Sequence, residues 1–240
     1  MRKVKNMSER TELFLNEYKR MEAFASSKFN LQDTESAVYH LINLPEYRYI
    51  RTELEYCRKV RNVLQHNPKI RDSFAVEPSA EMIELLRKTI EIILNPPKAR
   101  EIAIPKTKIL YKTLDDYVRP TMTEMIERTF THIPILENGI VTGVFSENTV
   151  LSYLADEQII GVDDTTRFFD LKAYLPIDVH KSESFRFIPQ DMPLAEVSLI
   201  FEDALKKQDR IGLVFITQTG KSTEKVLGII TAWDVAGANA

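Results

Sequence analysis

The chain has 240 residues, of which 44% are hydrophobic, so it can bury a sizeable core, and its length suits two ordinary domains. Its single cysteine, Cys57, excludes an intramolecular disulfide, and it lacks the apolar run of about 18 residues that spans a bilayer. Because the basic N-terminus lacks the apolar stretch of a signal peptide, we expect a cytoplasmic protein without a membrane partner, and the net charge of -3 argues against a general nucleic-acid coat.

Residues 8 to 94 carry only helical patterns of apolar residues. The first helix is expected after Ser8 and the second after the cap candidate Asp33, and Pro45 separates the second from the third. The third should end near Pro68, because proline disfavours helical geometry in the residue before it. It carries an apolar stripe at helical spacing, formed by Ile50, Leu54, Cys57, Val60 and Leu64. With a fourth helix capped by Ser79, the sequence predicts a four-helix bundle over residues 1–95, ended by paired prolines.

Short β-type runs alternate with helices from residue 100 onward, which predicts helices packed on small sheets. The runs cover residues 109–111, 132–136, 140–145, 185–188, 213–216 and 226–230. Asn138 and Gly139 predict a hairpin between the second and third runs. A regular helix is expected over 193–206, whereas Pro120 should interrupt the early turns of the earlier one.

The C-terminal half contains an internal duplication. A glycine, two apolar residues and a hydroxyl residue recur in the same order in 142–150 and 227–235, 85 positions apart. The duplication predicts one repeat over 100–156 and another over 185–240. The connector between them, 157–184, is expected to hold a short helix around residues 168–174.

The second copy carries a recognisable motif from Gly228 to Asp234. Its order of glycine, two apolar residues, Thr231, two variable residues and aspartate resembles the motif of CBS domains, and the strand from Thr131 to Ile135 supports the likeness. Residues of about 100–237 therefore resemble a tandem CBS pair, two β-α-β-β-α repeats. The resemblance implies that an adenine nucleotide (AMP, ADP or ATP) binds between the repeats as a regulatory ligand and controls an attached domain.

The residues of the second copy suit this role. A hydroxyl and free N–H groups at a helix N-terminus can meet a phosphate, and a carboxylate one turn on can accept both ribose hydroxyls. We therefore expect Gly228, Thr231 and Asp234 to form a nucleotide site. Thr-x-x-Asp at a helix start is also a capping box that needs no ligand, and this alternative stays open.

The first copy departs from the motif. Ser146 keeps the hydroxyl, but Thr149 stands in the place of the aspartate, so we expect one complete site and one degenerate site. His132 and Arg210 each precede an equivalent strand isoleucine, where the resemblance implies a basic side chain that contacts phosphate. A surface role for either residue stays equally open.

The third helix contains Arg61, Asn62 and His66, which resemble the Arg-polar-x-His signature of the HEPN family of helical bundles. The resemblance implies a metal-independent endoribonuclease that works as a homodimer. His66 would move a proton, Arg61 would stabilise the charged phosphorane, and Asn62 would orient them. On a continuous helix Arg61 and His66 lie about 140° apart. Their convergence therefore requires the helix to end before Pro68, or a partner from a second chain.

The sequence thus predicts an α+β protein in which a HEPN-like four-helix bundle precedes a CBS pair. One hypothesis is a nucleotide-regulated endoribonuclease with RNA as its partner. The alternative is a non-enzymatic nucleotide sensor that signals to a protein partner through a dimerising helical domain, and a third is a scaffold that binds nothing. Four histidines are scattered without metal-ligand spacing, so no metal is expected: His40, His66, His132 and His180.

Overall fold

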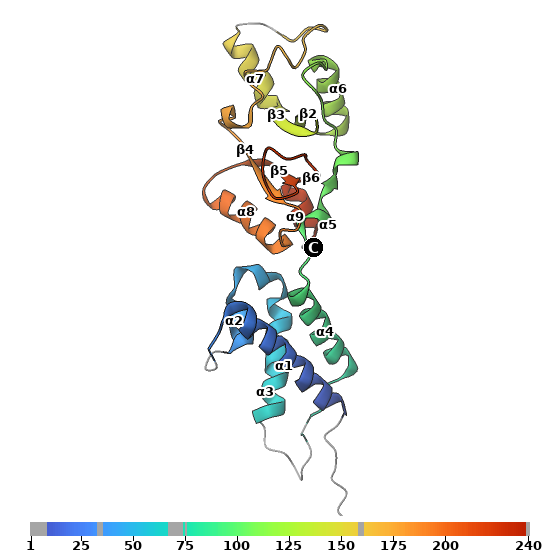
Figure 1. Cartoon of the computed structure of the whole chain (residues 1–240), viewed down its shortest axis with the longest axis vertical. Coiled ribbons are helices and arrows are strands. Elements are labelled where there is room, and N and C mark those ends of the chain that lie inside the picture. The colour runs from blue at the N-terminus through green and yellow to red at the C-terminus, as the bar shows by residue number, and fades with distance from the viewer. Residues whose placement is uncertain (1–8, 33–35, 67–73, 75, 158–160, 239–240) are drawn as a thin grey trace, which may run out of the picture. The chain divides into compact units, whose positions relative to one another are not determined.

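The computed structural model describes residues 9–32, 36–66, 74, 76–157 and 161–238. They belong to two compact units, 1–97 and 98–240 (Figure 1). The described part of the first unit is helical, whereas the second combines helices and strands, so the chain is α+β as predicted. Among the described residues, no helix has the length and apolar character needed to cross a membrane.

The N-terminal unit has four α-helices and one 3-10 helix among its described residues. They are α1 (Glu9–Phe29), α2 (Ala37–Asn43), η1 (Pro45–Ile50), α3 (Arg51–His66) and α4 (Ala80–Leu94). Phe14, Tyr18 and Leu86 lie in its core, and the apolar stripe of the third helix faces the same core. Burial of this stripe drives the packing of the amphipathic helices, since apolar surface leaves water when they associate.

The helix ends in this unit follow local capping rules. Ser79 caps α4 as predicted, because its hydroxyl accepts a hydrogen bond of 3.2 Å from the N–H of Met82. The cap candidate Asp33 lies outside the described residues, and the cap of α2 is Ser36. Pro45 occupies the first position of η1, where its missing N–H costs nothing.

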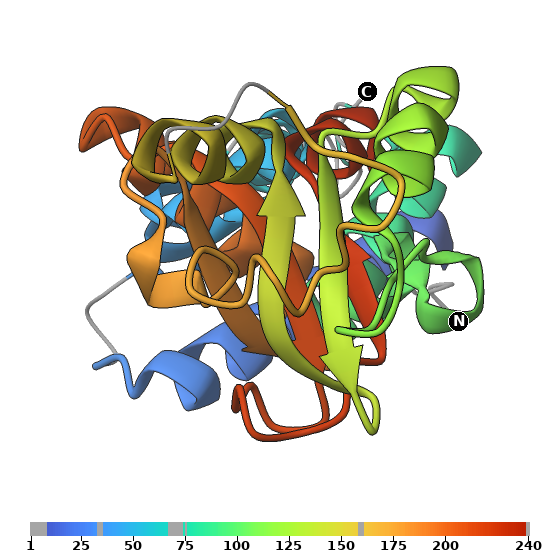
Figure 2. The same cartoon turned by 90° about the horizontal axis from the view of Figure 1, so that it is seen from above.

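The strands of the C-terminal unit form two sheets among the described residues. They are β1 (Ile104–Pro105), β2 (His132–Glu137), β3 (Ile140–Ser146), β4 (Ser184–Pro189), β5 (Ile211–Thr217) and β6 (Gly228–Ile230). One sheet has the order β1-β6-β5-β4, with β4 parallel to β5, and the other is the antiparallel pair β2-β3. The predicted hairpin is confirmed, because Asn138 and Gly139 adopt positive φ angles of 51° and 84° between β2 and β3. Figure 2 looks onto this hairpin, with α6 and α7 beside it.

Seven helical segments accompany these strands among the described residues. They are α5 (Ala99–Ile102), η2 (Lys106–Lys108), α6 (Val118–Arg128), α7 (Glu147–Asp156), η3 (Ile177–Val179), α8 (Leu194–Lys206) and α9 (Ala232–Ala238). The predicted helix over 193–206 is confirmed as α8.

Three expectations for this unit were wrong. The run 109–111 forms no strand, because the chain turns through η2 and next pairs at Lys112, which makes an isolated bridge to Ile135. Pro120 does not interrupt α6, since the helix starts at Val118 and its first turn needs no N–H donor. The connector segment 168–174 forms successive turns instead of a helix.

The two sheets share one apolar core. Leu136 and Val144 of the hairpin pack in the same cluster as Phe185 and Phe215 of the larger sheet. The connector also presses on β3, where the N–H of Val144 donates a hydrogen bond of 2.8 Å to the carbonyl of Leu175. The duplicated elements therefore fold as one body around the connector.

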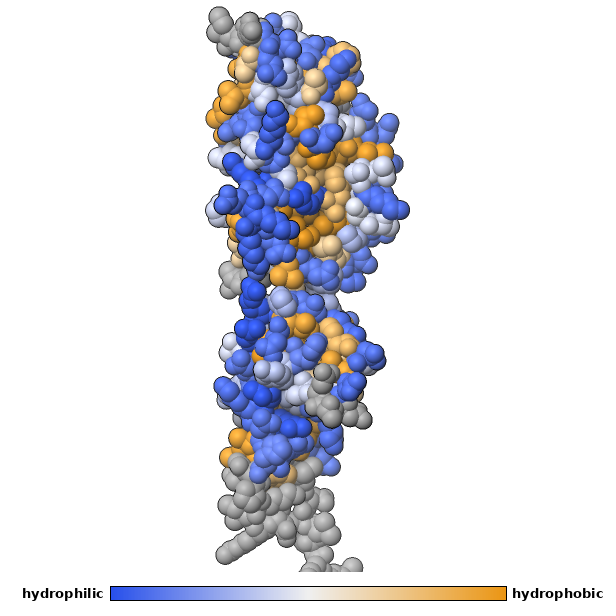
Figure 3. Space-filling model, turned by 90° about the vertical axis from the view of Figure 1, so that its left-hand side faces the viewer, coloured by the Kyte–Doolittle hydropathy of each residue, from blue (hydrophilic) through white to orange (hydrophobic). Residues whose placement is uncertain are grey.

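Apolar side chains also reach the surface of the C-terminal unit. On the face drawn in Figure 3, hydrophobic side chains gather in a band on this unit between hydrophilic ones. Trp233, Leu205 and Ile126 are its most exposed large apolar residues among those described, and each lies on a helix. The helices thus keep apolar groups in contact with solvent, while the strands are covered.

Candidate functional site

A cavity of about 560 Å³ lies in the C-terminal unit. Both copies of the duplication line it, the first with Thr131 and His132 and the second with Thr231 and Trp233. Most of the wall is apolar, including Ile109, Ile211, Leu213 and Ile229. The cavity is therefore a largely apolar pocket with a few polar groups, which is the usual composition of a small-molecule site.

Thr231 stands at the second junction, which we define as the point where β6 meets α9. The carboxylate of Asp234 accepts hydrogen bonds of 2.7 Å from both the N–H and the hydroxyl of Thr231 through the same oxygen, Oδ2. Its Oδ1 makes no hydrogen bond to the described residues. Asp234 itself is not part of the cavity wall. It fixes the side chain of Thr231, which does line the cavity.

The cavity wall also carries two cations. Arg210 and Lys108 are exposed, and among the described residues neither side chain has a hydrogen-bond or ion-pair partner. The acid on the same wall, Asp209, is held by the guanidinium of Arg186 at 2.5 Å. The uncompensated charge at the wall is therefore positive. Lys108 had no sequence signal, because only the fold brings it to the same cavity wall as Arg210.

Gly228 lies in β6, away from the cavity wall. A Cβ atom there would lie 3.0 Å from the carbonyl oxygen of Ile104 and 3.2 Å from the Cβ of Ala103. The glycine therefore allows β6 to approach the neighbouring strand closely, and its place in the motif has this packing reason.

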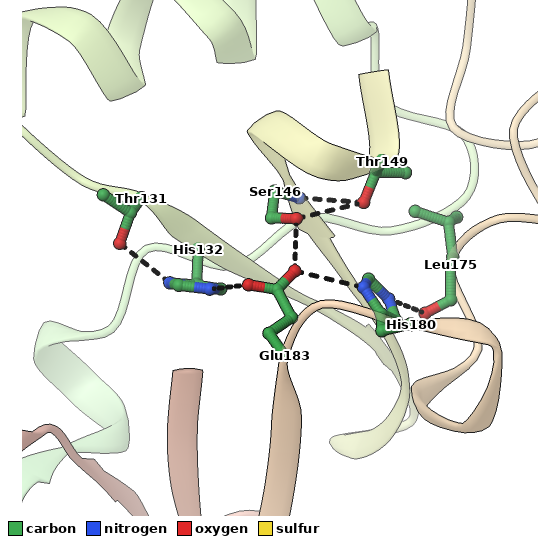
Figure 4. Close-up of polar contacts among 7 residues, drawn as sticks. All are labelled: Thr131, His132, Ser146, Thr149, Leu175, His180 and Glu183. Atoms are coloured by element: carbon green, nitrogen blue, oxygen red, sulfur yellow. Dashed lines mark hydrogen bonds and ion pairs between the residues drawn. The ribbon is translucent and has the colours of Figure 1, made fainter. Parts of the chain in front are cut away.

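The first junction, where β3 meets α7 at Ser146, is buried. Figure 4 shows His132, Ser146 and His180 around the carboxylate of Glu183, which comes from the connector, with Thr149 against Ser146. Ser146 donates from its hydroxyl to Glu183 at 2.6 Å and from its N–H to the hydroxyl of Thr149 at 3.0 Å. Ser146 and Thr149 are each 2% exposed and do not line the cavity. The structure therefore turns the polar groups of this junction toward the protein itself.

Two histidines complete the network around Glu183. His132 donates from Nε2 to one carboxylate oxygen at 2.6 Å, and His180 donates from Nδ1 to the other at 3.2 Å. The other nitrogen of His180 lies 3.3 Å from the carbonyl of Leu175, so both of its ring nitrogens face acceptors. His132 belongs to this network and to the cavity wall at once, so it joins the two.

The electrostatics of the network favour an ion pair. Burial alone raises the pKa of the Glu183 carboxyl, but the hydrogen bonds from His132, His180 and Ser146 outweigh it and hold that pKa well below its usual range. Burial lowers the pKa of His180, yet its bonds to Glu183 and Leu175 dominate and leave it raised. The Glu183 side chain is thus ionised. It lies in the irregular connector, where no sequence motif marked it as a functional residue.

Of the residues singled out on α3, Arg61 and Asn62 contact each other, but neither contacts His66 among the described residues. Arg61 bonds to Asn62 at 3.2 Å, lies 3.7 Å from a carboxylate oxygen of Glu22 and sits over the ring of Tyr18. His66 is exposed at the last position of α3, which stays continuous up to it. Arg61 is therefore held on the α1 side of the helix, away from His66.

No protein-family model matches the chain, and no curated protein matches it either. A hemolysin-like protein containing a CBS domain, from Oenococcus oeni, shares 13% identity and a TM-score of 0.40 over 61% of this chain and 92% of its own. CBSX2 in complex with AMP shares 16% identity and a TM-score of 0.41 over 59% and 94%. CbpB in complex with c-di-AMP shares 14% identity and a TM-score of 0.45 over 63% and 89%. We therefore base the function of this chain on its own residues.

Proposed function

We propose that the chain is a nucleotide sensor whose C-terminal unit works as a CBS pair and binds an adenine nucleotide in the cavity. Residues 100–156 and 185–240 are its two repeats, 157–184 is the connector, and 1–95 is the domain that it controls. The observation that carries the proposal is the apolar cavity whose wall includes Thr231 together with two cations that have no partner among the described residues.

The lining matches the parts of such a ligand. An adenine ring can lie against the apolar wall, where burial of its faces is favourable, and the exposed indole of Trp233 offers a surface for stacking. The charges of Lys108 and Arg210 suit a phosphate, and the hydroxyl of Thr231 can donate to it by turning away from Asp234, which keeps the N–H of Thr231. Asp234, which lies off the cavity wall, acts on the ligand through Thr231, whose N–H its carboxylate holds. The volume of the cavity, about 560 Å³, falls within the range of small-molecule sites.

For the helical unit we propose the non-enzymatic role, in which it dimerises and passes the state of the cavity to a protein partner. The contacts of Arg61 support this choice, because Glu22, Asn62 and Tyr18 occupy the guanidinium that RNA cleavage would need. A HEPN-like endoribonuclease with Arg61, Asn62 and His66 remains the competing hypothesis. It requires a second chain to bring an arginine and a histidine together.

Calorimetric titration of the full chain with AMP, ADP and ATP tests the nucleotide proposal. Thr231→Val removes one hydrogen bond to a charged group, which is worth about 1.5 kcal/mol, and should weaken binding roughly tenfold. Thr219→Val is the matched control, since this threonine bonds to Glu224 and lies off the cavity wall. Absence of binding for all three nucleotides, or equal affinity in both variants, contradicts the proposal.

A cleavage assay, in which RNA is incubated with the full chain in each nucleotide-bound state, tests the role of the helical unit. We expect no turnover. Metal-independent cleavage that His66→Ala abolishes would establish the endoribonuclease instead.

A further inference from the structure

The two junctions differ in what meets their hydroxyl groups. At the second junction, Thr231 lines the cavity, and among the described residues its hydroxyl bonds to Asp234 of the helix that follows it. At the first junction, the equivalent Ser146 donates to Glu183, a carboxylate that arrives from 37 residues further along the chain. The first hydroxyl thus meets a carboxylate from a distant part of the chain and is buried, whereas the second meets a carboxylate three residues away and its threonine lines the cavity.

The surroundings of Glu183 form a complete site for a carboxylate. Its two oxygens receive three donors, from His132, Ser146 and His180, and its side chain is only 1% exposed. Buried charges of this kind are tolerated only where donors replace the lost water. Glu183 is therefore bound in the way that a protein binds a separate anion.

The backbone is also shaped for this arrangement. A Cβ atom on Gly212 would lie 2.7 Å from Nε2 of His132, so only a glycine leaves room for the ring that holds Glu183. The ring of Phe185 packs edge-on against both histidines, with centroids 5.9 Å from His132 and 5.1 Å from His180. Residues from β2, β4, β5 and the connector thus hold the donors around one carboxylate.

We propose that the carboxylate of Glu183 is an internal ligand of the first repeat. It fills the anion position between His132, Ser146 and His180, and so leaves the cavity at Thr231 as the one nucleotide site of the chain. The count of one nucleotide rests on the function proposed above. The internal ligand itself does not, because all three of its donors belong to this chain.

Chemical rescue tests the internal ligand. Glu183→Ala removes a CH₂–COO⁻ group, which acetate matches in size and charge, whereas acetamide matches the shape without the charge. We expect acetate to raise the melting temperature of this variant saturably, against chloride at equal ionic strength, and acetamide to have no such effect. Glu224→Ala is the matched control, since its carboxylate bonds to Thr219 in an exposed loop. Equal responses of the two variants to acetate overturn the proposal.

A second variant keeps the test decisive if Glu183→Ala does not fold. Glu183→Gln preserves the shape and removes the charge, so it should melt at a lower temperature than Glu224→Gln and gain nothing from acetate. Equal melting temperatures of the two glutamine variants would refute the internal ligand. In the nucleotide titration of the wild-type chain we expect one site, and two sites would overturn the claim that Glu183 closes the first junction. A chain that shows the rescue but binds no nucleotide refutes only the proposed function.

Discussion

Gly212→Ala should damage the cavity wall, because the new methyl group has no free space. Its Cβ would lie 2.7 Å from Nε2 and 3.1 Å from Cδ2 of His132, and 3.0 Å from a ring carbon of Phe185. The His132 ring cannot move away without lengthening its 2.6 Å bond to Glu183. Overpacking of this kind costs about 1–3 kcal/mol, which lowers the melting temperature by roughly 3–10 °C in a unit of this size.

The assay is thermal unfolding followed by tryptophan fluorescence. Trp233 is the single tryptophan of the chain and lies in the C-terminal unit, so its signal reports that unit. Gly161→Ala is the control, since a Cβ there meets no atom within 4 Å. Adding Gly212→Ala to Glu183→Gln should cost less than in the wild type, because the bond that resists the ring movement is already weakened. Equal melting of the Gly212→Ala and Gly161→Ala variants would refute this reasoning.

Three further outcomes follow from the same geometry. Asp234→Asn removes the charge that holds Thr231. It should weaken nucleotide binding about tenfold and lower the free energy of unfolding by about 1 kcal/mol. Unchanged affinity in calorimetry would contradict this role of Asp234. The raised pKa of His180 contributes stability that is present below its unfolded pKa of about 6.5 and is lost as the pH rises through the folded value. The wild type should therefore melt at a lower temperature at pH 8 than at pH 6, and Glu183→Gln should show a smaller difference; equal differences would contradict the pairing. Gly143→Ala should destabilise more than Gly212→Ala, because its Cβ would lie 2.5 Å from the backbone carbonyl oxygen of Leu175, and a native melting temperature would argue otherwise.

Local signals in the sequence predicted the elements that depend on neighbouring residues. The hairpin at Asn138 and Gly139 needs positive φ angles, which these two residue types supply. Ser79 caps α4 through a residue only three positions away. Such features are encoded within one turn of chain, so periodicity and turn chemistry reveal them.

Features that depend on distant contacts were missed or misjudged. The strand expected at 109–111 had the right apolar character, but β6 pairs with Ile104 and Pro105, and this run stays outside the sheet. Glu183 showed no pattern, because its role exists only where His132, Ser146 and the connector come together. The degenerate motif of the first copy predicts one complete and one degenerate site, yet it could not reveal that the carboxylate of Glu183 bonds to Ser146.

The indole resonance of Trp233 gives the most direct test of the central claim, that the cavity binds an adenine nucleotide. The chain has one tryptophan, so its ¹⁵N-labelled form gives a single indole N–H signal, and this indole lines the cavity. We predict that AMP shifts this signal saturably in the wild type, and that Thr231→Val needs about ten times more AMP for the same shift. An indole signal that stays in place at saturating AMP, or shifts equally in Thr231→Val, would contradict the account.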